Sequence, residues 1–149
     1  MKIVLLDHEL YRLGIRLILS AVPGCEIVGE AGAERDALDV VGTAAPDVVI
    51  MDSVLPGLQG AEGVKAILGR APGARILILT DDRRILAAAD AMTAGAAGYA
   101  MKGDSNAEIC RAIERVQAGR IYVAPALASR LLARLRRRGL SDQPAPYAG

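Results

Sequence analysis

Four polar residues stand directly after apolar segments, and their side chains could together handle a phosphoryl group. Asp52 follows the apolar run 48–51 and precedes a Pro-Gly turn. Asp7, Thr80 and Lys102 follow three other apolar runs. Ligands bind outside the carboxyl ends of the strands in open α/β sheets, so we expect these side chains to meet at one sheet edge. A carboxylate, a hydroxyl and an ammonium converging on one acid suit phosphoryl chemistry.

The segments that must position these residues alternate five times between strand and helix patterns. The predicted strands are residues 3–6, 27–30, 48–51, 75–79 and 98–101. The predicted helices are residues 9–21, 34–45, 60–70, 83–94 and a fifth that ends at 118. Leu10, Leu13 and Leu17 give the first helix its apolar spacing. Ser105 and Glu108 form a predicted capping box at the start of the fifth.

This alternation predicts an α/β fold, in which a parallel sheet is covered by helices on both faces. Five strands fit the flavodoxin-like, doubly wound order 2-1-3-4-5, a choice that draws partly on the resemblance given below. The first and third strands then flank the switch point, which brings Asp7 and Asp52 together.

An extra C-terminal helix is predicted from residue 126 to about 138, with Leu127, Leu131 and Leu135 as its apolar stripe. We therefore divide the chain into a domain at 1–120, an extension helix at 121–139 and the start of an interdomain linker at 140–149. A further domain is expected beyond the linker. Residues 120–139 carry six arginines and no acid. They are interpreted as a solvated helix face, and contact with an adjoining domain or nucleic acid is the alternative.

Composition limits the class of protein. The chain has 149 residues, 52% of them hydrophobic and 23% charged, and its net charge is +1. These values are typical of one globular domain and argue against a general polyanion binder. No apolar stretch approaches the roughly 18–20 residues of a membrane span, and the first strand begins at once, so we expect a cytoplasmic protein. Cys25 and Cys110 follow no metal or redox spacing and are expected to be free thiols.

Several motifs, in their order and spacing, resemble one known family across nearly the whole chain. They are 7–10 (Asp-His-Glu-Leu), 28–31 (Val-Gly-Glu-Ala), 46–52 (Pro-Asp-Val-Val-Ile-Met-Asp), 55–60 (Leu-Pro-Gly-Leu-Gln-Gly), 76–80 (Ile-Leu-Ile-Leu-Thr) and 94–102 (Ala-Gly-Ala-Ala-Gly-Tyr-Ala-Met-Lys). The chain resembles the receiver domain of bacterial two-component response regulators. Within that family it is most similar to the NarL/FixJ type, whose receivers carry a LuxR-type helix-turn-helix.

The resemblance implies a role for each residue of the site. Asp52 would be the phosphoacceptor, attacking the phosphorus carried by a sensor histidine kinase. Asp7, Asp52 and the backbone carbonyl of Val54 would bind Mg²⁺. Lys102 would neutralise one phosphoryl oxygen, and Thr80 would donate a hydrogen bond to another.

The resemblance also implies a switch and partners. Thr80 and Tyr99 would shift together on phosphorylation. The protein would not be an enzyme. It would form a homodimer, through the first and fifth helices or the fourth and fifth, and would reach promoter DNA through a helix-turn-helix domain not in this chain.

Two positions depart from the family pattern. Leu6 stands where receivers carry the first acid of an acidic pair, which usually holds the metal through water, so Mg²⁺ binding should be weakened. Asp81 stands where a small residue usually admits the phosphodonor, and it could lean toward the site, point to solvent or repel phosphate. His8, in contrast, is interpreted as a local helix-start contact rather than a ligand.

Other functions remain open at this stage. An atypical receiver could work without phosphorylation, gated by a small-molecule ligand or by constitutive dimerisation. A phosphatase with an aspartyl nucleophile is disfavoured, because dehalogenase-like phosphatases carry Asp-x-Asp whereas Asp52 precedes Ser53-Val54. A flavin carrier is disfavoured because no Ser/Thr-rich loop follows the first strand and aromatic content is 3%.

Overall fold

A computed structural model describes residues 1–139, which build one main sheet with helices on both faces. The sheet is parallel throughout and has the strand order β2-β1-β3-β6-β7-β8. Its strands are β1 (Lys2–Leu6), β2 (Glu26–Ala31), β3 (Val48–Met51), β6 (Arg75–Thr80), β7 (Gly98–Met101) and β8 (Tyr122–Val123). A small antiparallel ribbon follows β3 and consists of β4 (Val54–Leu55) and β5 (Leu58–Gln59).

The predicted flavodoxin-like order is confirmed, but the predicted count of five strands is wrong. The order 2-1-3-4-5 corresponds to β2-β1-β3-β6-β7, and β8 adds a sixth strand beside β7. β8 holds only Tyr122 and Val123, which pair with Gly98 and Tyr99. Two residues carry no periodicity, so only their pairing with β7 defines them as a strand.

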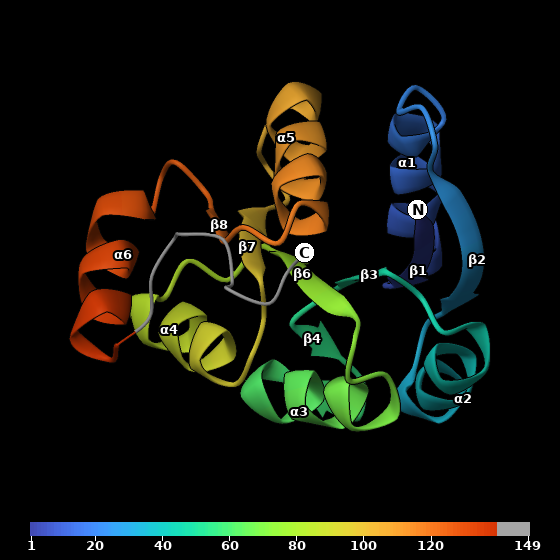
Figure 1. The fold of residues 1–149 in the computed structure, drawn as a ribbon, viewed down its shortest axis with the longest axis horizontal. Helices are drawn as coiled ribbons and strands as arrows, with labels where there is room; N and C mark the ends of the chain where they lie inside the picture. The colour runs from blue at the N-terminus through green and yellow to red at the C-terminus, as the bar shows by residue number, and fades with distance from the viewer. Residues whose placement is uncertain (140–149) are drawn as a thin grey trace.

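Helices cover the two faces of the sheet unequally (Figure 1). The first face holds α1 (Glu9–Leu19) and α5 (Asn106–Gln117), and the second holds α2 (Glu34–Ala44), α3 (Gly60–Arg70) and α4 (Ile85–Thr93). Side chains alternate along each strand, so Ile3 and Leu5 pack with α1 and α5 while Val4 and Leu6 pack with the other layer. This alternation produces two cores, one on each face.

The apolar spacing that predicted the first helix does not mark its buried face. Leu10, Leu13 and Leu17 are 82%, 45% and 75% exposed, whereas Ile15 and Leu19 are buried against the sheet. α1 therefore has apolar residues on two faces, and periodicity alone does not say which one packs on the sheet.

Local hydrogen bonds define the starts of α4 and α5. α4 begins at Ile85 rather than 83, because the Asp82 carboxylate accepts a hydrogen bond from the backbone N–H of Arg84 and holds a turn there. At α5 the predicted N-cap is confirmed, since the Ser105 hydroxyl accepts from the Glu108 N–H at 3.2 Å. The Glu108 carboxylate accepts from the Ser105 hydroxyl, which replaces the backbone contact of a full capping box.

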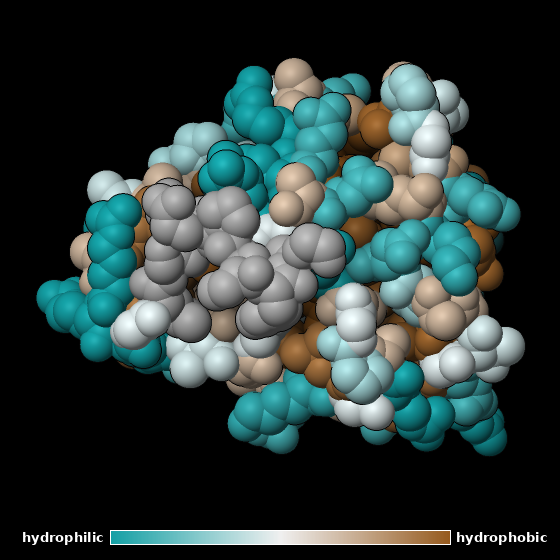
Figure 2. Space-filling model, in the orientation of Figure 1, coloured by the Kyte–Doolittle hydropathy of each residue, from teal (hydrophilic) through white to brown (hydrophobic). Residues whose placement is uncertain are grey.

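The last helix, α6 (Ala128–Arg137), packs beside α4 and β8. Leu127, Leu131 and Leu135 are buried in the same core as α4, which confirms the predicted stripe. Hydrophilic residues gather over α6 at the left edge of Figure 2. The predicted linker at 140–149 lies outside the described residues, and the division at residue 120 stays a prediction. Within residues 1–139, no helix is long and apolar enough to cross a membrane.

Candidate functional site

The carboxyl ends of β1, β3 and β7 bring three charged side chains together. Asp7, Asp52 and Lys102 each follow the last residue of a strand. The Lys102 Nζ lies 3.2 Å from Asp7 Oδ1 and 3.4 Å from Asp52 Oδ2. All three side chains are at most 9% exposed. One ammonium therefore balances two buried carboxylates, as the register of the parallel strands predicts.

Asp7 is buried with one of its two carboxylate oxygens unpartnered among the described residues. Its Oδ1 accepts hydrogen bonds from the His8 backbone N–H at 2.7 Å and from Lys102. Its Oδ2 is buried and has no hydrogen-bond partner among the described residues. Burial raises the pKa of Asp7 above its usual value, and the nearby Asp52 charge acts in the same direction, while the bonds from His8 and Lys102 oppose the rise. Asp7 thus offers one uncompensated oxygen inside the site.

Asp52 is held by the turn that follows it. Its Oδ1 accepts from the Val54 backbone N–H at 3.3 Å, and its Oδ2 lies 3.6 Å from His8 Nε2. The interpretation of His8 as a helix-start contact applies only to its backbone. His8 is the N-cap of α1, but its side chain makes no capping hydrogen bond.

Tyr11 is a site residue that the sequence did not reveal. Its ring centroid lies 4.0 Å from Lys102 Nζ, and its hydroxyl donates to the Lys102 carbonyl at 2.9 Å. The ring thus covers the ammonium and fixes the backbone that carries it. An aromatic residue in the first turn of a helix has no sequence signal that distinguishes this role from ordinary packing.

Thr80 lies in the site, but its hydroxyl makes its hydrogen bonds with Ser53 and Asp82 rather than with Asp52. Its Oγ1 is 2.6 Å from the hydroxyl of Ser53 and accepts from the Asp82 backbone N–H at 3.1 Å. Both Thr80 and Ser53 are buried. Ser53 is a second residue that sequence reasoning missed as part of the site, although it directly follows Asp52.

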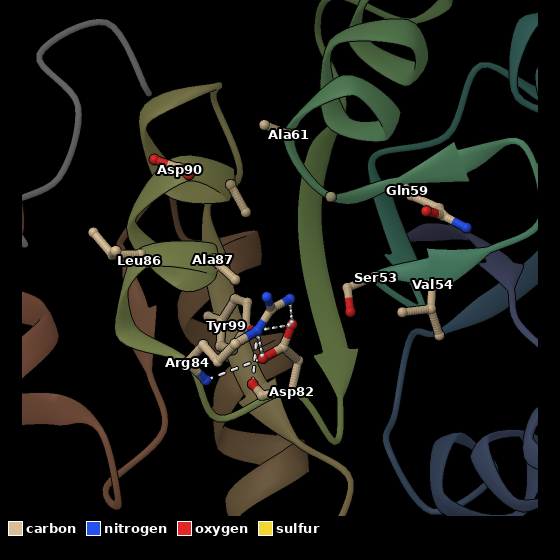
Figure 3. A pocket seen from close by; sticks show the side chains of 12 residues that line it. Ser53, Val54, Gln59, Ala61, Asp82, Arg84, Leu86, Ala87, Asp90 and Tyr99 are labelled. Atoms are coloured by element: carbon tan, nitrogen blue, oxygen red, sulfur yellow. Dashed lines mark hydrogen bonds and ion pairs between the residues drawn. The ribbon is translucent and has the colours of Figure 1, made fainter.

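Tyr99 is buried next to a cavity of about 360 Å³ (Figure 3). Its hydroxyl donates to the Asp82 carbonyl at 2.8 Å, and burial raises its pKa well above the usual value. In Figure 3 the Arg84 guanidinium folds over the Asp82 carboxylate on one side, and Ser53 and Val54 lie on the other. That ion pair lowers the pKa of Asp82. The Thr80–Asp82–Tyr99 contacts thus join the site to the start of α4.

The two unusual positions differ in their surroundings. Leu6 is fully buried in the core beneath α2 and α3, so it supplies no polar group to the site. Asp81 is exposed. Among the acids and histidines of residues 1–139, the group close enough to share one cation is Asp7, His8 and Asp52, whose ligand atoms lie within 4.8 Å of one another. Burial raises the pKa of Tyr11 and the Asp81 charge adds to the rise, so this exposed acid lies near the ring that covers Lys102, and its role stays a prediction.

Comparison with protein families decides the class of this domain. The model of the response regulator receiver domain matches residues 3–114. The chain belongs to this family. Receiver domains typically bind Mg²⁺ at an acidic pocket, and the family generally serves signal transduction rather than catalysis.

Known receivers and regulators support the LuxR-type branch. The chain is 39% identical over 143 residues to the DNA-binding transcriptional activator DevR/DosR of Mycobacterium tuberculosis, covering 96% of this chain and 65% of that protein. It is 40% identical over 125 residues to the response regulator UvrY of Escherichia coli, covering 84% and 57%. The crystal structure of a LuxR-family two-component response regulator from Aurantimonas sp. SI85-9A1 shares 36% identity, with a TM-score of 0.82 and coverage of 91% and 97%. The receiver thus spans less than two thirds of these two curated relatives. Regulators of this type generally work with sensor kinases and DNA.

Proposed function

We propose that this receiver belongs to a cytoplasmic two-component response regulator and that Asp52 accepts a phosphoryl group from a sensor histidine kinase. The observation that carries the proposal is the position of Lys102, whose ammonium lies within 3.4 Å of Asp52 and 3.2 Å of Asp7. An ion pair that only stabilises the fold needs one carboxylate for one ammonium, whereas Lys102 lies between two. Two carboxylates and one ammonium at the end of a sheet suit the transfer of a phosphoryl group.

The chemistry is a displacement at phosphorus. An oxygen of Asp52 forms the new P–O bond while the P–N bond to the kinase histidine breaks, and the histidine nitrogen leaves. The product is an acyl phosphate on Asp52. Lys102 compensates the added negative charge, and the Tyr11 ring lies over its ammonium.

The residues present fit a divalent cation of the family type. The unpartnered Oδ2 of Asp7 is a buried oxygen that a cation would satisfy. Asp7, Asp52 and the carbonyl of Val54 would hold Mg²⁺, and the replacement of the first acid by Leu6 would weaken its binding. A bound Mg²⁺ would supply positive charge that offsets repulsion between the acids and the phosphoryl oxygens.

The output would be transcriptional. DevR/DosR is described as a DNA-binding transcriptional activator, and this chain covers 65% of its length. We propose that a helix-turn-helix domain beyond this chain binds promoter DNA, and that α6 connects it to the receiver. A phosphoryl group on Asp52 would draw the Thr80 hydroxyl toward it, and Tyr99 would shift with Asp82 at the start of α4.

Phosphorylation is tested by incubating the chain with acetyl phosphate and Mg²⁺ and measuring its intact mass. We expect the mass of one phosphoryl group to be gained by the natural chain and lost in Asp52→Asn. Asp81→Asn is the matched control, since Asp81 is an exposed acid near the site, and it should still gain the mass.

A folded natural chain that gains no mass from acetyl phosphate or the kinase would contradict the proposal. That result would favour the alternative of a phosphorylation-independent receiver, gated by a ligand or by constitutive dimerisation. Circular dichroism of each variant shows that the fold is intact.

A further inference from the structure

The imidazole of His8 faces the acidic cluster and makes no capping hydrogen bond to α1. Its backbone N–H is bonded to Asp7 Oδ1, which fixes the start of α1 beside the site. Its Nε2 lies 3.6 Å from Asp52 Oδ2, too long for a hydrogen bond. Two ligands of one ion, each about 2.1 Å from it, are about 3.0–3.4 Å apart. The observed separation is therefore close to that of two atoms that share a cation.

A second observation points to a ligand at the same place. Asp7 is 1% exposed, and its Oδ2 is buried without a partner among residues 1–139. Leaving a buried carboxylate oxygen unpaired is costly. Lys102 and the His8 N–H already use the other oxygen of this carboxylate. A cation bound between Asp7, Asp52 and His8 would satisfy the remaining one.

The ligand set also differs in chemistry from an all-oxygen site. Leu6, where the family carries its first acid, is buried in the core and supplies no oxygen. Among the His, Cys, Asp and Glu side chains of residues 1–139, His8 adds a ligand atom within 4.8 Å of both acids. Magnesium prefers oxygen ligands, whereas imidazole nitrogen suits late first-row cations such as Ni²⁺ and Zn²⁺.

We propose that His8 is a metal ligand of this receiver, and that with Asp7 and Asp52 it makes the site selective for late first-row divalent cations over Mg²⁺. The inference deepens the proposed function, because it names the metal class of the same site. Its side-chain ligands are two carboxylates and one imidazole. The side chain of His8 is 60% exposed, which leaves the site open to ions from solvent.

The test measures metal binding with no phosphodonor present. The full chain is stripped of metal with EDTA and titrated with Co²⁺, Zn²⁺ and Mg²⁺ by calorimetry, and the visible absorption of Co²⁺ is recorded. We expect His8→Ala to lower Co²⁺ and Zn²⁺ affinity about ten-fold or more, to change the Co²⁺ absorption, and to leave Mg²⁺ affinity within about two-fold. Asp7→Asn should weaken all three metals.

Two controls separate this site from other sources of metal binding. The double variant Cys25→Ser with Cys110→Ser removes both thiols and should bind Co²⁺ like the natural chain. Co²⁺ affinity and absorption that are unchanged in His8→Ala would overturn the proposal, as would Co²⁺ binding that is lost with the thiols.

The outcome is independent of phosphorylation. A chain that binds Co²⁺ through His8 but gains no mass from acetyl phosphate would support this inference and contradict the proposed function. A chain that is phosphorylated with Mg²⁺ and binds Co²⁺ equally well without His8 would do the reverse.

Discussion

The buried hydroxyl pair of Ser53 and Thr80 sets where the threonine points. The two oxygens are 2.6 Å apart, and Thr80 also accepts from the Asp82 N–H. In the proposed phosphorylated state, Thr80 would instead donate to a phosphoryl oxygen on Asp52. Ser53 therefore competes with the phosphoryl group for the same hydroxyl.

Ser53→Ala should favour the activated arrangement. Removing one neutral hydrogen bond is worth about 1 kcal/mol, so affinity for beryllofluoride, a phosphoryl mimic, should rise roughly five-fold. The measurement is a titration with beryllofluoride and Mg²⁺, followed by tyrosine fluorescence. The double variant with Thr80→Ala is the control and should show no gain over Thr80→Ala alone. Unchanged or weaker binding by Ser53→Ala would contradict the competition.

Asp7 predicts how stability depends on pH in metal-free buffer. Burial raises its pKa in the folded state, so the ionised form destabilises the fold, and this cost appears as pH rises above the ordinary value of 3.8. Asp7→Asn should therefore have the higher Tm at neutral pH, and the difference should shrink as pH falls toward 3.8. Lys102 keeps Asp52 as its partner in the variant. Thermal unfolding across pH measures both proteins, and a lower Tm for Asp7→Asn at pH 7 would contradict the expectation.

At the scale of residues, the sequence predicted where the charged side chains meet, but not the contacts that the surrounding side chains make with them. Asp7, Asp52 and Lys102 meet because each ends a parallel strand, and apolar runs reveal strand ends. The direction of the Thr80 hydroxyl and the Tyr11 ring over Lys102 depend on side-chain contacts between elements that are distant in sequence. Neither Ser53 nor Tyr11 carries a local signal for such a contact.

At the scale of elements, two glycines of α3 have opposite surroundings. A Cβ at Gly63 would lie 2.6 Å from the Leu58 carbonyl oxygen, whereas at Gly69 nothing lies within 4 Å. The close approach of Gly63 lets α3 sit against β5, which follows the Asp52 turn. Gly69 is exposed and has no such neighbour.

Alanine at these two positions should therefore change stability in opposite directions. Gly63→Ala should lower the free energy of unfolding by about 1–3 kcal/mol, because the backbone of β5 must move. Gly69→Ala should raise it by about 0.5–1 kcal/mol, because alanine favours a helix. Urea unfolding measures both, and each variant is the control for the other. Equal effects at the two positions would show that the contact with Leu58 is unimportant.

The elements themselves were predictable where their patterns are long. The bounds of β3, α3 and β7 match the predicted ones, because apolar runs and Pro or Gly residues delimit them. β8 was missed because two residues are too few to show an alternating apolar pattern. Its pairing with β7 joins two segments that the whole of α5 separates in the sequence. On α1 the sequence offered two apolar faces, and only the sheet selects Ile15 and Leu19.

At the scale of the whole molecule, α4 and α6 link the site to the end of the described chain. The Asp82–Tyr99 contact lies at the start of α4, and α6 packs along α4 through Leu131 and Leu135. Arg138 then donates to Asp90 at 3.2 Å and to Thr93 at 2.9 Å. A shift of α4 would therefore move α6, which supports a route from Asp52 toward the proposed output domain.

The exposed leucines of α1 predict how two copies associate. Leu10, Leu13 and Leu17 follow helical spacing and are 45–82% exposed, and Gly14 between them leaves room for a close approach. A second copy would bury this apolar stripe. Leu10→Ser with Leu17→Ser should raise the dimer dissociation constant about ten-fold or more in beryllofluoride, measured by analytical ultracentrifugation. The Tm of the monomer should change little, because neither side chain packs in the core.

Leu86 on α4 offers the matched control, since it is 56% exposed and lies on the helix that the family resemblance gives as the alternative contact. Leu86→Ser should leave the dimer intact if α1 forms the contact. Dissociation by Leu86→Ser, with the α1 variant still dimeric, would place the contact on α4. That outcome would join the dimer directly to the proposed switch of Thr80 and Tyr99 through the Asp82 contact, so phosphorylation would control assembly without passing through α1.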